Sequence, residues 1–262
     1  MMCADDGPSF ELVELPNGWT VGRFPALDAL GAVHAVTTRR GLDVNLVRDD
    51  HQAAGRELVE ALGLRGAAYC GQVHGELVLI VDRDGPAGEA DGLVTRTPGL
   101  GVWGRGADCP LILAACPTGV VAVAHASWRG TVRMIAPRMV AQMAALGAKP
   151  QKIVACVSPS AGPCCYEVGP EVLKAAVEGI GPHAATFFRA TGPALPAGQG
   201  RRDRKALFDL WSANRDQLLR AGLRERNIHV AGLCTMCRND LFPSHRREGD
   251  AAGRFAAIVA RK

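Results

Sequence analysis

The sequence predicts an α/β or α+β fold, formed by a single three-layer domain over residues 1–262 with a mixed sheet and flanking helices. Two observations lead to this class. Short apolar runs of strand length alternate with segments that carry apolar residues at helical spacing, and strands return near the end of the chain. No Ser-rich, acidic or low-complexity linker divides the 262 residues, which favours one domain.

Composition excludes several classes of protein. The chain is 48% hydrophobic and 21% charged, as in an ordinary globular protein. No apolar run approaches the ~20 residues of a membrane span, and residues 1–6 lack the features of a secretory signal. Nine scattered cysteines suit a reducing compartment, so we expect a cytoplasmic protein without a membrane partner. A net charge of +4 and 5% aromatic residues give little support for nucleic-acid binding.

The first predicted elements lead to a candidate anion-binding residue. Residues 10–15 alternate like a strand, and residues 32–38 form a β-branched strand that ends at Arg39. A guanidinium at a strand end can hold phosphate through paired N–H donors, although a surface salt bridge is the alternative role of Arg39. Residues 50–62 have helical spacing and stop before Gly63, as an amphipathic helix would.

The next segment contains a histidine and a carboxylate beside glycines. His74 lies in the loop 72–75, which leads into an alternating strand over 76–81. Asp91 precedes another strand, where it would either orient a histidine ligand or cap a turn. Residues 99–106 are rich in glycine but lack the G-x-G-x-x-G spacing of a dinucleotide-binding loop; their glycines would let the backbone approach the site.

A predicted hairpin brings a thiol and an imidazole together. The apolar runs 111–115 and 120–124 are separated by a Pro-Thr-Gly turn, so Cys109 and His125 should lie at the same end of two antiparallel strands. With His74 they would make a three-ligand set. Catalytic zinc sites use three protein ligands and keep a fourth position open, whereas a hydrogen-bonded histidine and a buried apolar cysteine are the alternative.

The second half of the chain continues the alternation of helices and strands. A helix over 131–146, with Thr131 as N-cap, would place its amino terminus near the metal, an arrangement that favours anions. The stretch 192–200 is rich in Gly, Pro and Ala and is expected to be a surface loop. The remaining elements are strands over 153–157, 228–232 and 255–260 and helices over 170–179 and 205–221.

Four cysteines outside this set are not expected to form a metal site. Cys164 and Cys165 are adjacent, and adjacent side chains on an extended chain point to opposite faces, so they should be poorly placed to bind one ion together. Cys234 and Cys237 form a lone C-x-x-C, which is a weak signal without a second cysteine pair at finger-like spacing. We expect Cys234 and Cys237 to be core cysteines.

Six sequence blocks, in order, resemble the signatures of the YfiH family, also called laccase-domain or polyphenol oxidoreductase proteins. They cover most of the chain from about Thr37 onward: residues 72–75 (QVHG), 90–95 (ADGLVT), 107–110 (ADCP), 125–130 (HASWRG), 162–169 (GPCCYEVG), and CT at 234–235 with SHRR at 244–247 and GR at 253–254. The chain departs from the family's Thr-Arg-x-Gly-Gly block, because Leu42 replaces the second glycine and a shorter loop follows.

The resemblance implies that His74, Cys109 and His125 bind zinc. It also implies phosphorolysis of adenosine, inosine or methylthioadenosine with phosphate as co-substrate, together with adenosine deamination by a metal-activated water. The candidate catalytic residues are Arg39, Asp91, Glu167 and His245. The candidate substrate-binding residues are Arg39, Gln72, Arg129, Tyr166 and Arg246.

Three other readings stay open. The seven histidines include no His-x-His pair, so a multicopper cluster is improbable, although a His₂Cys set can accept one copper ion. Some members of the family are described as peptidoglycan editing factors that remove serine from a muramyl precursor. A non-enzymatic, metal-stabilised interaction protein is the third alternative.

Overall fold

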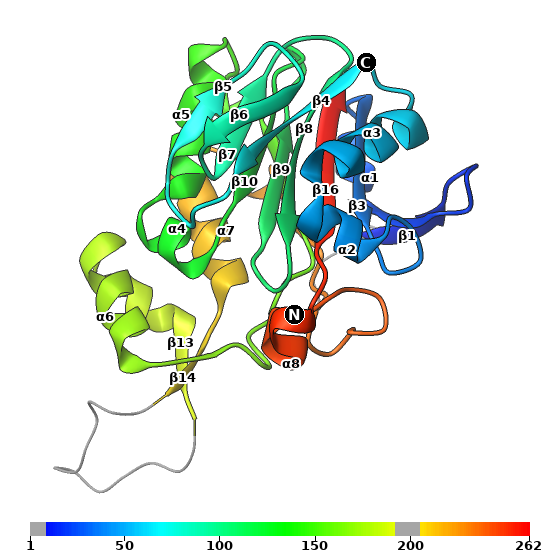
Figure 1. The fold of residues 1–262 in the computed structure, drawn as a ribbon. Helices are drawn as coiled ribbons and strands as arrows, with labels where there is room; N and C mark the ends of the chain where they lie inside the picture. Colours follow the sequence, from blue (N-terminus) through cyan, green and yellow to red (C-terminus); the bar gives the residue numbers. More distant parts are fainter. Residues whose placement is uncertain (1–8, 192–204) are drawn as a thin grey trace, which may run out of the picture.

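Two mixed β-sheets pack face to face in the computed structural model, which describes residues 9–191 and 205–262, and helices cover both outer faces (Figure 1). The predicted class, mixed sheet with flanking helices, is therefore confirmed. We expected three layers, and the structure has four. The reason is that the buried strands are apolar on both faces, so a second sheet occupies one face where we expected helices.

The first sheet has its last strand in sequence at its centre. β16 (Phe255–Arg261) pairs antiparallel with β3 (Ala32–Thr37) on one side and with β8 (Leu100–Gly106) on the other. The full order is β1 (Glu11–Glu14), β2 (Thr20–Arg23), β3, β16, β8, β4 (Gly66–Gly71) and β6 (Gly85–Glu89).

The second sheet contains the predicted hairpin at its centre. β9 (Leu111–Ala115) and β10 (Val121–His125) are antiparallel, with His125 opposite Leu111. The full order is β15 (Ile228–Val230), β11 (Val154–Val157), β9, β10, β7 (Gly92–Thr95) and β5 (Val78–Ile80).

Side-chain alternation along β16 shows how the layers form. Phe255 and Val259 are fully buried against the second sheet, whereas Ile258 is fully buried against the helical layer on the other face. β10 divides in the same way, because Val123 faces the first sheet and Ala122 faces helices. Each central strand thus contributes to two separate apolar layers.

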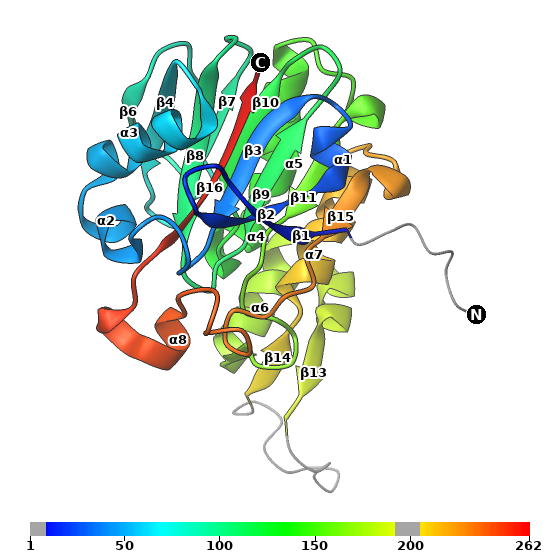
Figure 2. The same cartoon turned by 90° about the vertical axis from the view of Figure 1, so that its right-hand side faces the viewer.

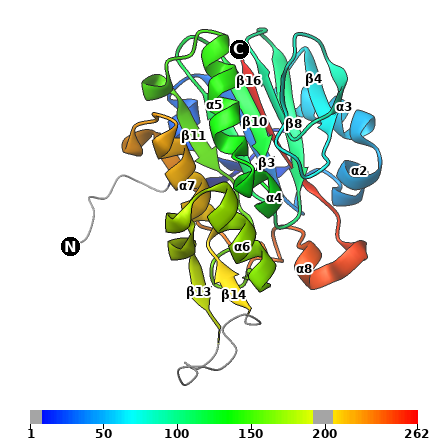
Figure 3. The same cartoon turned by 90° about the vertical axis from the view of Figure 1, so that its left-hand side faces the viewer.

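Helices cover the two outer faces. α2 (Val44–Asp49) and α3 (His51–Leu62) cover the first sheet, while α5 (Ile135–Ala145) and α7 (Leu210–Arg220) cover the second, as Figure 3 shows for α5. Figure 2 shows β1 and β3 from the opposite side, with α1 (Pro25–Asp28) beside them. Among the described residues, no helix combines the length and apolar character needed to cross a membrane.

A smaller sheet lies beside one end of the two large ones. Its strands run in the order β12 (Glu167–Val168), β14 (Ala206–Phe208) and β13 (Phe188–Ala190), next to α6 (Pro170–Gly179) and the 3₁₀ turn η2 (Pro182–Phe187) (Figure 1). The predicted loop over 192–200 lies outside the described residues. Short helical segments complete the chain: α4 (Trp128–Val132), η1 (Pro150–Lys152), η4 (Glu225–Asn227), α8 (His245–Glu248) and η5 (Gly249–Ala251).

Several predicted elements need correction. The expected helix over 131–146 is two helices, α4 and α5, with a break at Met134, whose φ is 67°. Ser127 is the N-cap, since its side chain accepts the amide hydrogen of Gly130, and Thr131 lies inside α4. The helix expected over 205–221 begins only at Leu210, because residues 206–208 pair as β14. The glycine-rich stretch 99–106 is largely the buried strand β8.

Candidate metal centre

The three predicted ligands converge. His74, Cys109 and His125 have donor atoms that all lie within 4.8 Å of one another, and the two imidazole rings meet edge to face with centroids 4.9 Å apart. The hairpin explains part of this arrangement, because Cys109 lies just before β9 and His125 is the last residue of β10. His74 arrives from the loop between β4 and β5.

Asp91 links the loop that carries His74 to the ring of His125. Its carboxylate accepts the backbone N–H groups of Val73 (3.1 Å), His74 (3.1 Å) and Gly75 (2.6 Å), so it fixes the loop that presents His74. The same carboxylate lies 2.8 Å from Nδ1 of His125, which leaves Nε2 of that ring for a metal. Asp91 is only 1% exposed. Asp91 thus contacts a histidine and also caps a loop, the two alternatives considered for it, and its role at a metal site stays a prediction.

Backbone strain is concentrated at this centre. Only three non-glycine residues in the described ranges have a positive φ, and two of them are His74 (59°) and Asp108 (86°), the residue before Cys109. Such conformations cost about 1–3 kcal/mol each and persist where surrounding contacts fix them. The carboxylate of Asp108 supplies such contacts, because it accepts the hydroxyl hydrogen of Thr235 (2.7 Å) and the backbone N–H of Arg246 (2.6 Å).

The ligands influence one another's ionisation. Burial acts to raise the pKa of the Cys109 thiol, but the charge and hydrogen bond of His125, with those of His74, outweigh burial and bring the pKa to about 6. Burial acts to lower the pKa of His125, but the Cys109 thiolate and the Asp91 carboxylate raise it to about 9. The mutual attraction of these groups therefore favours the charged forms of both Cys109 and His125.

This donor set fits a metal ion. Two imidazoles and a thiolate are ligands that zinc accepts, and three protein ligands leave a fourth tetrahedral position for a substrate or water. The thiolate form that a metal requires is already favoured at Cys109. His74 is exposed, so the centre can be reached from the surface.

Two of the predicted substrate residues are engaged by protein groups. Arg39 forms an ion pair with Glu248 (2.5 Å) and donates through Nε to the carbonyl of Asn239 (2.9 Å), which is the salt-bridge alternative considered for it. The side-chain amide of Gln72 donates to the carbonyl of Arg105 (2.9 Å) and accepts its N–H (2.8 Å), so it fastens the loop before His74 to β8.

The remaining predicted residues lie around the loops that meet at Asp108. The guanidinium of Arg246 lies over the ring of the buried Tyr166 at 5.1 Å and donates to the carbonyl of Glu167. The carboxylate of Glu167 pairs with Lys205 (2.9 Å). His245 is exposed at the start of α8, and the exposed Arg129 lies against the ring of its neighbour Trp128. Their roles stay predictions.

Sequence reasoning missed a pair of half-buried arginines near the centre. Arg105 lies on β8 opposite Ala256, and Arg254 lies just before β16. Burial lowers the pKa of Arg105, and the charge of Arg254 lowers it further. Burial and the charge of Arg48 lower the pKa of Arg254, against the opposing charges of Cys109 and Asp108. Neither guanidinium has a carboxylate within ion-pair distance in the described part of the chain.

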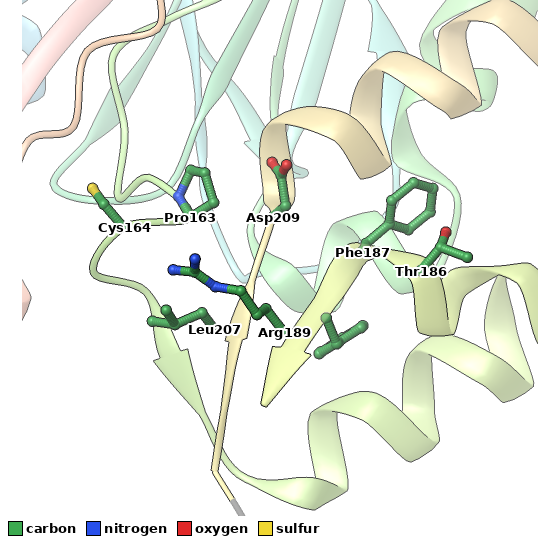
Figure 4. Close-up of a pocket in the computed structure, with 8 residues that line it drawn as sticks. Pro163, Cys164, Thr186, Phe187, Arg189, Leu207 and Asp209 are labelled. Atoms are coloured by element: carbon green, nitrogen blue, oxygen red, sulfur yellow. The ribbon is translucent and has the colours of Figure 1, made fainter. Parts of the chain in front are cut away.

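A separate pocket of about 450 Å³ opens beside the small sheet (Figure 4). Cys164, Arg189 and Asp209 are among its lining residues, but none of the three metal ligands is. The structure also corrects our interpretation of the four outlying cysteines. Those at 164, 165, 234 and 237 have sulfur atoms within 4.8 Å of one another, and two of them are exposed.

Fold and site together define a mixed α/β protein with three candidate metal ligands at the end of a central hairpin. Comparison with known sequences gives the family. A model of the family described as multi-copper polyphenol oxidoreductase laccase matches residues 37–262, and the chain belongs to that family.

Its relatives include enzymes that act on nucleosides. The chain is 32% identical to purine nucleoside phosphorylase YlmD of Geobacillus stearothermophilus, over 94% of this chain and 95% of the relative. It is 36% identical to a purine nucleoside phosphorylase of Deinococcus radiodurans, over 96% and 93% of the two chains. A 38% match to adenosine deaminase RL5, from an unknown prokaryotic organism, covers 66% and 62%.

Solved structures agree in fold. The crystal structure of YlmD from Geobacillus stearothermophilus superposes with a TM-score of 0.81 at 31% identity, covering 96% of this chain and 98% of that one. The YfiH protein of Bacillus licheniformis gives a TM-score of 0.75 at 26% identity, covering 99% and 98%.

Proposed function

We propose that this protein is a zinc-dependent purine nucleoside phosphorylase that cleaves adenosine, inosine or methylthioadenosine with phosphate, and that it also deaminates adenosine. The observation that carries the proposal is the convergence of His74, Cys109 and His125 on one point. The chain matches two relatives named purine nucleoside phosphorylase over more than 90% of their length, and one named adenosine deaminase over 62% of its length. We place the enzyme in the cytoplasm, where a thiol ligand stays reduced.

Phosphate binding is assigned to Arg105 and Arg254. In phosphorolysis an oxygen of phosphate bonds to C1′ of the sugar while the bond from C1′ to the purine nitrogen breaks, and the base leaves with the electron pair. The anion must therefore be held beside the sugar. Two half-buried guanidiniums, neither of which is paired with a carboxylate in the described residues, would gain an anionic partner when phosphate arrives. This site replaces Arg39 as our first choice, because Arg39 is already paired with Glu248.

The protein groups around the metal have distinct tasks in this scheme. A bound zinc ion supplies a Lewis acid at the open fourth position. Asp91 holds Nδ1 of His125, which would leave Nε2 to bind the ion, and it holds the loop of His74. Glu167 and His245 are our candidates for moving a proton to the departing purine, and Tyr166 with Arg246 would line the nucleoside site.

One incubation tests the proposal. Purified protein is given adenosine with and without phosphate, and the products are separated by chromatography. We expect adenine and ribose 1-phosphate only when phosphate is present, together with inosine in both samples. Absence of every product from adenosine, inosine and methylthioadenosine would overturn the proposal. Release of serine from a muramyl precursor would favour the peptidoglycan editing alternative.

A matched pair of variants ties the activity to the centre. Cys109→Ala should lose turnover while keeping its fold, because one of three ligands is removed. Cys116→Ala is the control, since this buried, free thiol lies after the other end of β9, away from the ligands. Full activity of Cys109→Ala would contradict the proposal. Metal analysis of active protein, with zinc or copper added back to stripped protein, identifies the ion that supports turnover.

A further inference from the structure

Four cysteines outside the metal centre form a compact group. Cys164 and Cys165 lie in the turn between β11 and β12, whereas Cys234 and Cys237 lie in the loop that follows β15. All four sulfur atoms lie within 4.8 Å of one another. Two segments that are distant in sequence thus each contribute a pair of thiols to one point.

The spacing of the sulfur atoms matches a tetrahedral ion. Sγ of Cys237 lies 3.7 Å from Sγ of Cys164 and 3.5 Å from Sγ of Cys165. An ion with zinc–sulfur bonds of about 2.3 Å in tetrahedral geometry separates its sulfur ligands by about 3.8 Å. A disulfide would bring two sulfurs to about 2.05 Å, and all four of these cysteines are free.

The surrounding backbone supports a thiolate. The N–H of the buried Gly162 points to Sγ of Cys234 at 3.3 Å. Amides that point at the first sulfur of a C-x-x-C turn stabilise negative charge there, and thiolate is the form that binds metal.

We propose that Cys164, Cys165, Cys234 and Cys237 bind a second zinc ion, which is structural. Four protein ligands close the tetrahedron and leave no position for a substrate, so this ion would not take part in turnover. Figure 4 shows Cys164 at the edge of the pocket, with its sulfur directed away from Arg189, so the ion would lie beside the pocket and outside it.

The four cysteines lie on two loops that border the first candidate metal centre. Tyr166 directly follows Cys165, and Thr235 directly follows Cys234 and donates to Asp108, the residue before the ligand Cys109. In the described part of the chain, Ser160 and Cys234 are also joined by an isolated bridge between the two loops. A zinc ion here would fasten two loops that together border the first metal centre.

Metal stoichiometry tests the proposal. Protein purified in the presence of Zn²⁺, dialysed against buffer and measured by elemental analysis should contain about two zinc ions per chain, one for each group of ligands. Cys237→Ser should contain about one, and Cys116→Ser, the matched control, should still contain about two. Equal zinc contents in wild-type protein and Cys237→Ser would overturn the proposal.

The identity of the ligands is read from a second measurement. His74→Ala removes an exposed ligand of the first centre and leaves the cysteine group intact, so Co²⁺ bound to stripped His74→Ala should show the strong thiolate-to-cobalt absorption of a four-sulfur tetrahedral site. The same spectrum should be absent from the His74→Ala/Cys237→Ser double variant. A mass two hydrogens below that of the reduced chain, with no cobalt spectrum, would mean that these cysteines form a disulfide, and the proposal would fail.

Discussion

Replacing Asp91 by Asn tests how the first metal centre is held. The carboxylate of Asp91 accepts four hydrogens: Oδ1 interacts with His74 N and His125 Nδ1, and Oδ2 with Val73 N and Gly75 N. Asn has one acceptor oxygen, so its amide nitrogen would face two donors that lose their partner.

The magnitude follows from this count. A hydrogen bond to a charged group contributes about 1.5–3 kcal/mol, so losing two of them would cost about 3–6 kcal/mol before the loop relaxes. The lost hydrogen bond to His125 should also weaken metal binding. Loss of a carboxylate that hydrogen-bonds a metal-ligating histidine typically lowers metal affinity about 10–100-fold, which equals about 1.4–2.8 kcal/mol. We therefore expect Asp91→Asn to bind zinc 10–100-fold more weakly and to unfold more easily without metal.

Competition against a chromophoric chelator measures the zinc affinity, and urea unfolding of the stripped protein measures the stability. Asp43→Asn is the matched control, because Asp43 is the exposed N-cap of α2, where Asn is equally suitable. Unchanged zinc affinity in Asp91→Asn would refute the reasoning. Saturating zinc should restore kcat if Asp91 only positions the ligands, whereas a persistently low kcat would mean that it moves a proton.

Three further predictions concern other groups. Arg254→Met should raise KM for phosphate at least tenfold with little change in KM for the nucleoside, as steady-state kinetics would show, while equal changes in both would contradict the phosphate assignment. Burial lowers the pKa of His34 to about 4, so the unfolded chain takes up a proton on this side chain at a higher pH than the folded chain does. The free energy of unfolding should therefore fall by about 3 kcal/mol as the pH falls from 6.5 to 4. Urea unfolding should show a smaller fall in His34→Gln. Removing the metal should free the Cys109 thiolate, so the rate at which Cys109 is alkylated in stripped protein should rise with pH around 6. Added zinc should stop the alkylation. Mass spectrometry of the labelled peptide would measure both effects.

Local patterns predicted the elements whose causes are local. The hairpin of β9 and β10 follows from two apolar runs and a Pro-Thr-Gly turn, and α3 ends at Gly63, which adopts the left-handed conformation that favours glycine. Cys109 and His125 were brought together by that hairpin argument. The position of His74 could not be predicted from the hairpin, because it depends on the hydrogen bonds by which Asp91 holds a separate loop.

Features that depend on long-range packing escaped prediction. An apolar run such as β16 reads the same whether helices or a second sheet cover it, so the fourth layer was missed. We placed Cys164 and Cys165 on opposite faces because we assumed extended backbone, but these residues lie in a turn, and both reach Cys237. Arg105 lies on β8 and Arg254 just before β16, and no spacing in the sequence reveals that these two strands pair.

The central place of β16 has a consequence for synthesis of the chain. β3 and β8 do not pair with each other in the sheet, because β16 (residues 255–261) lies between them. Both strands are therefore synthesised long before the strand that pairs with them. Until then the nascent chain holds two open strand edges that could pair wrongly. Completion of the first sheet must therefore wait until translation reaches these residues, which predicts that arrest just before Phe255 yields a protease-sensitive, aggregation-prone product.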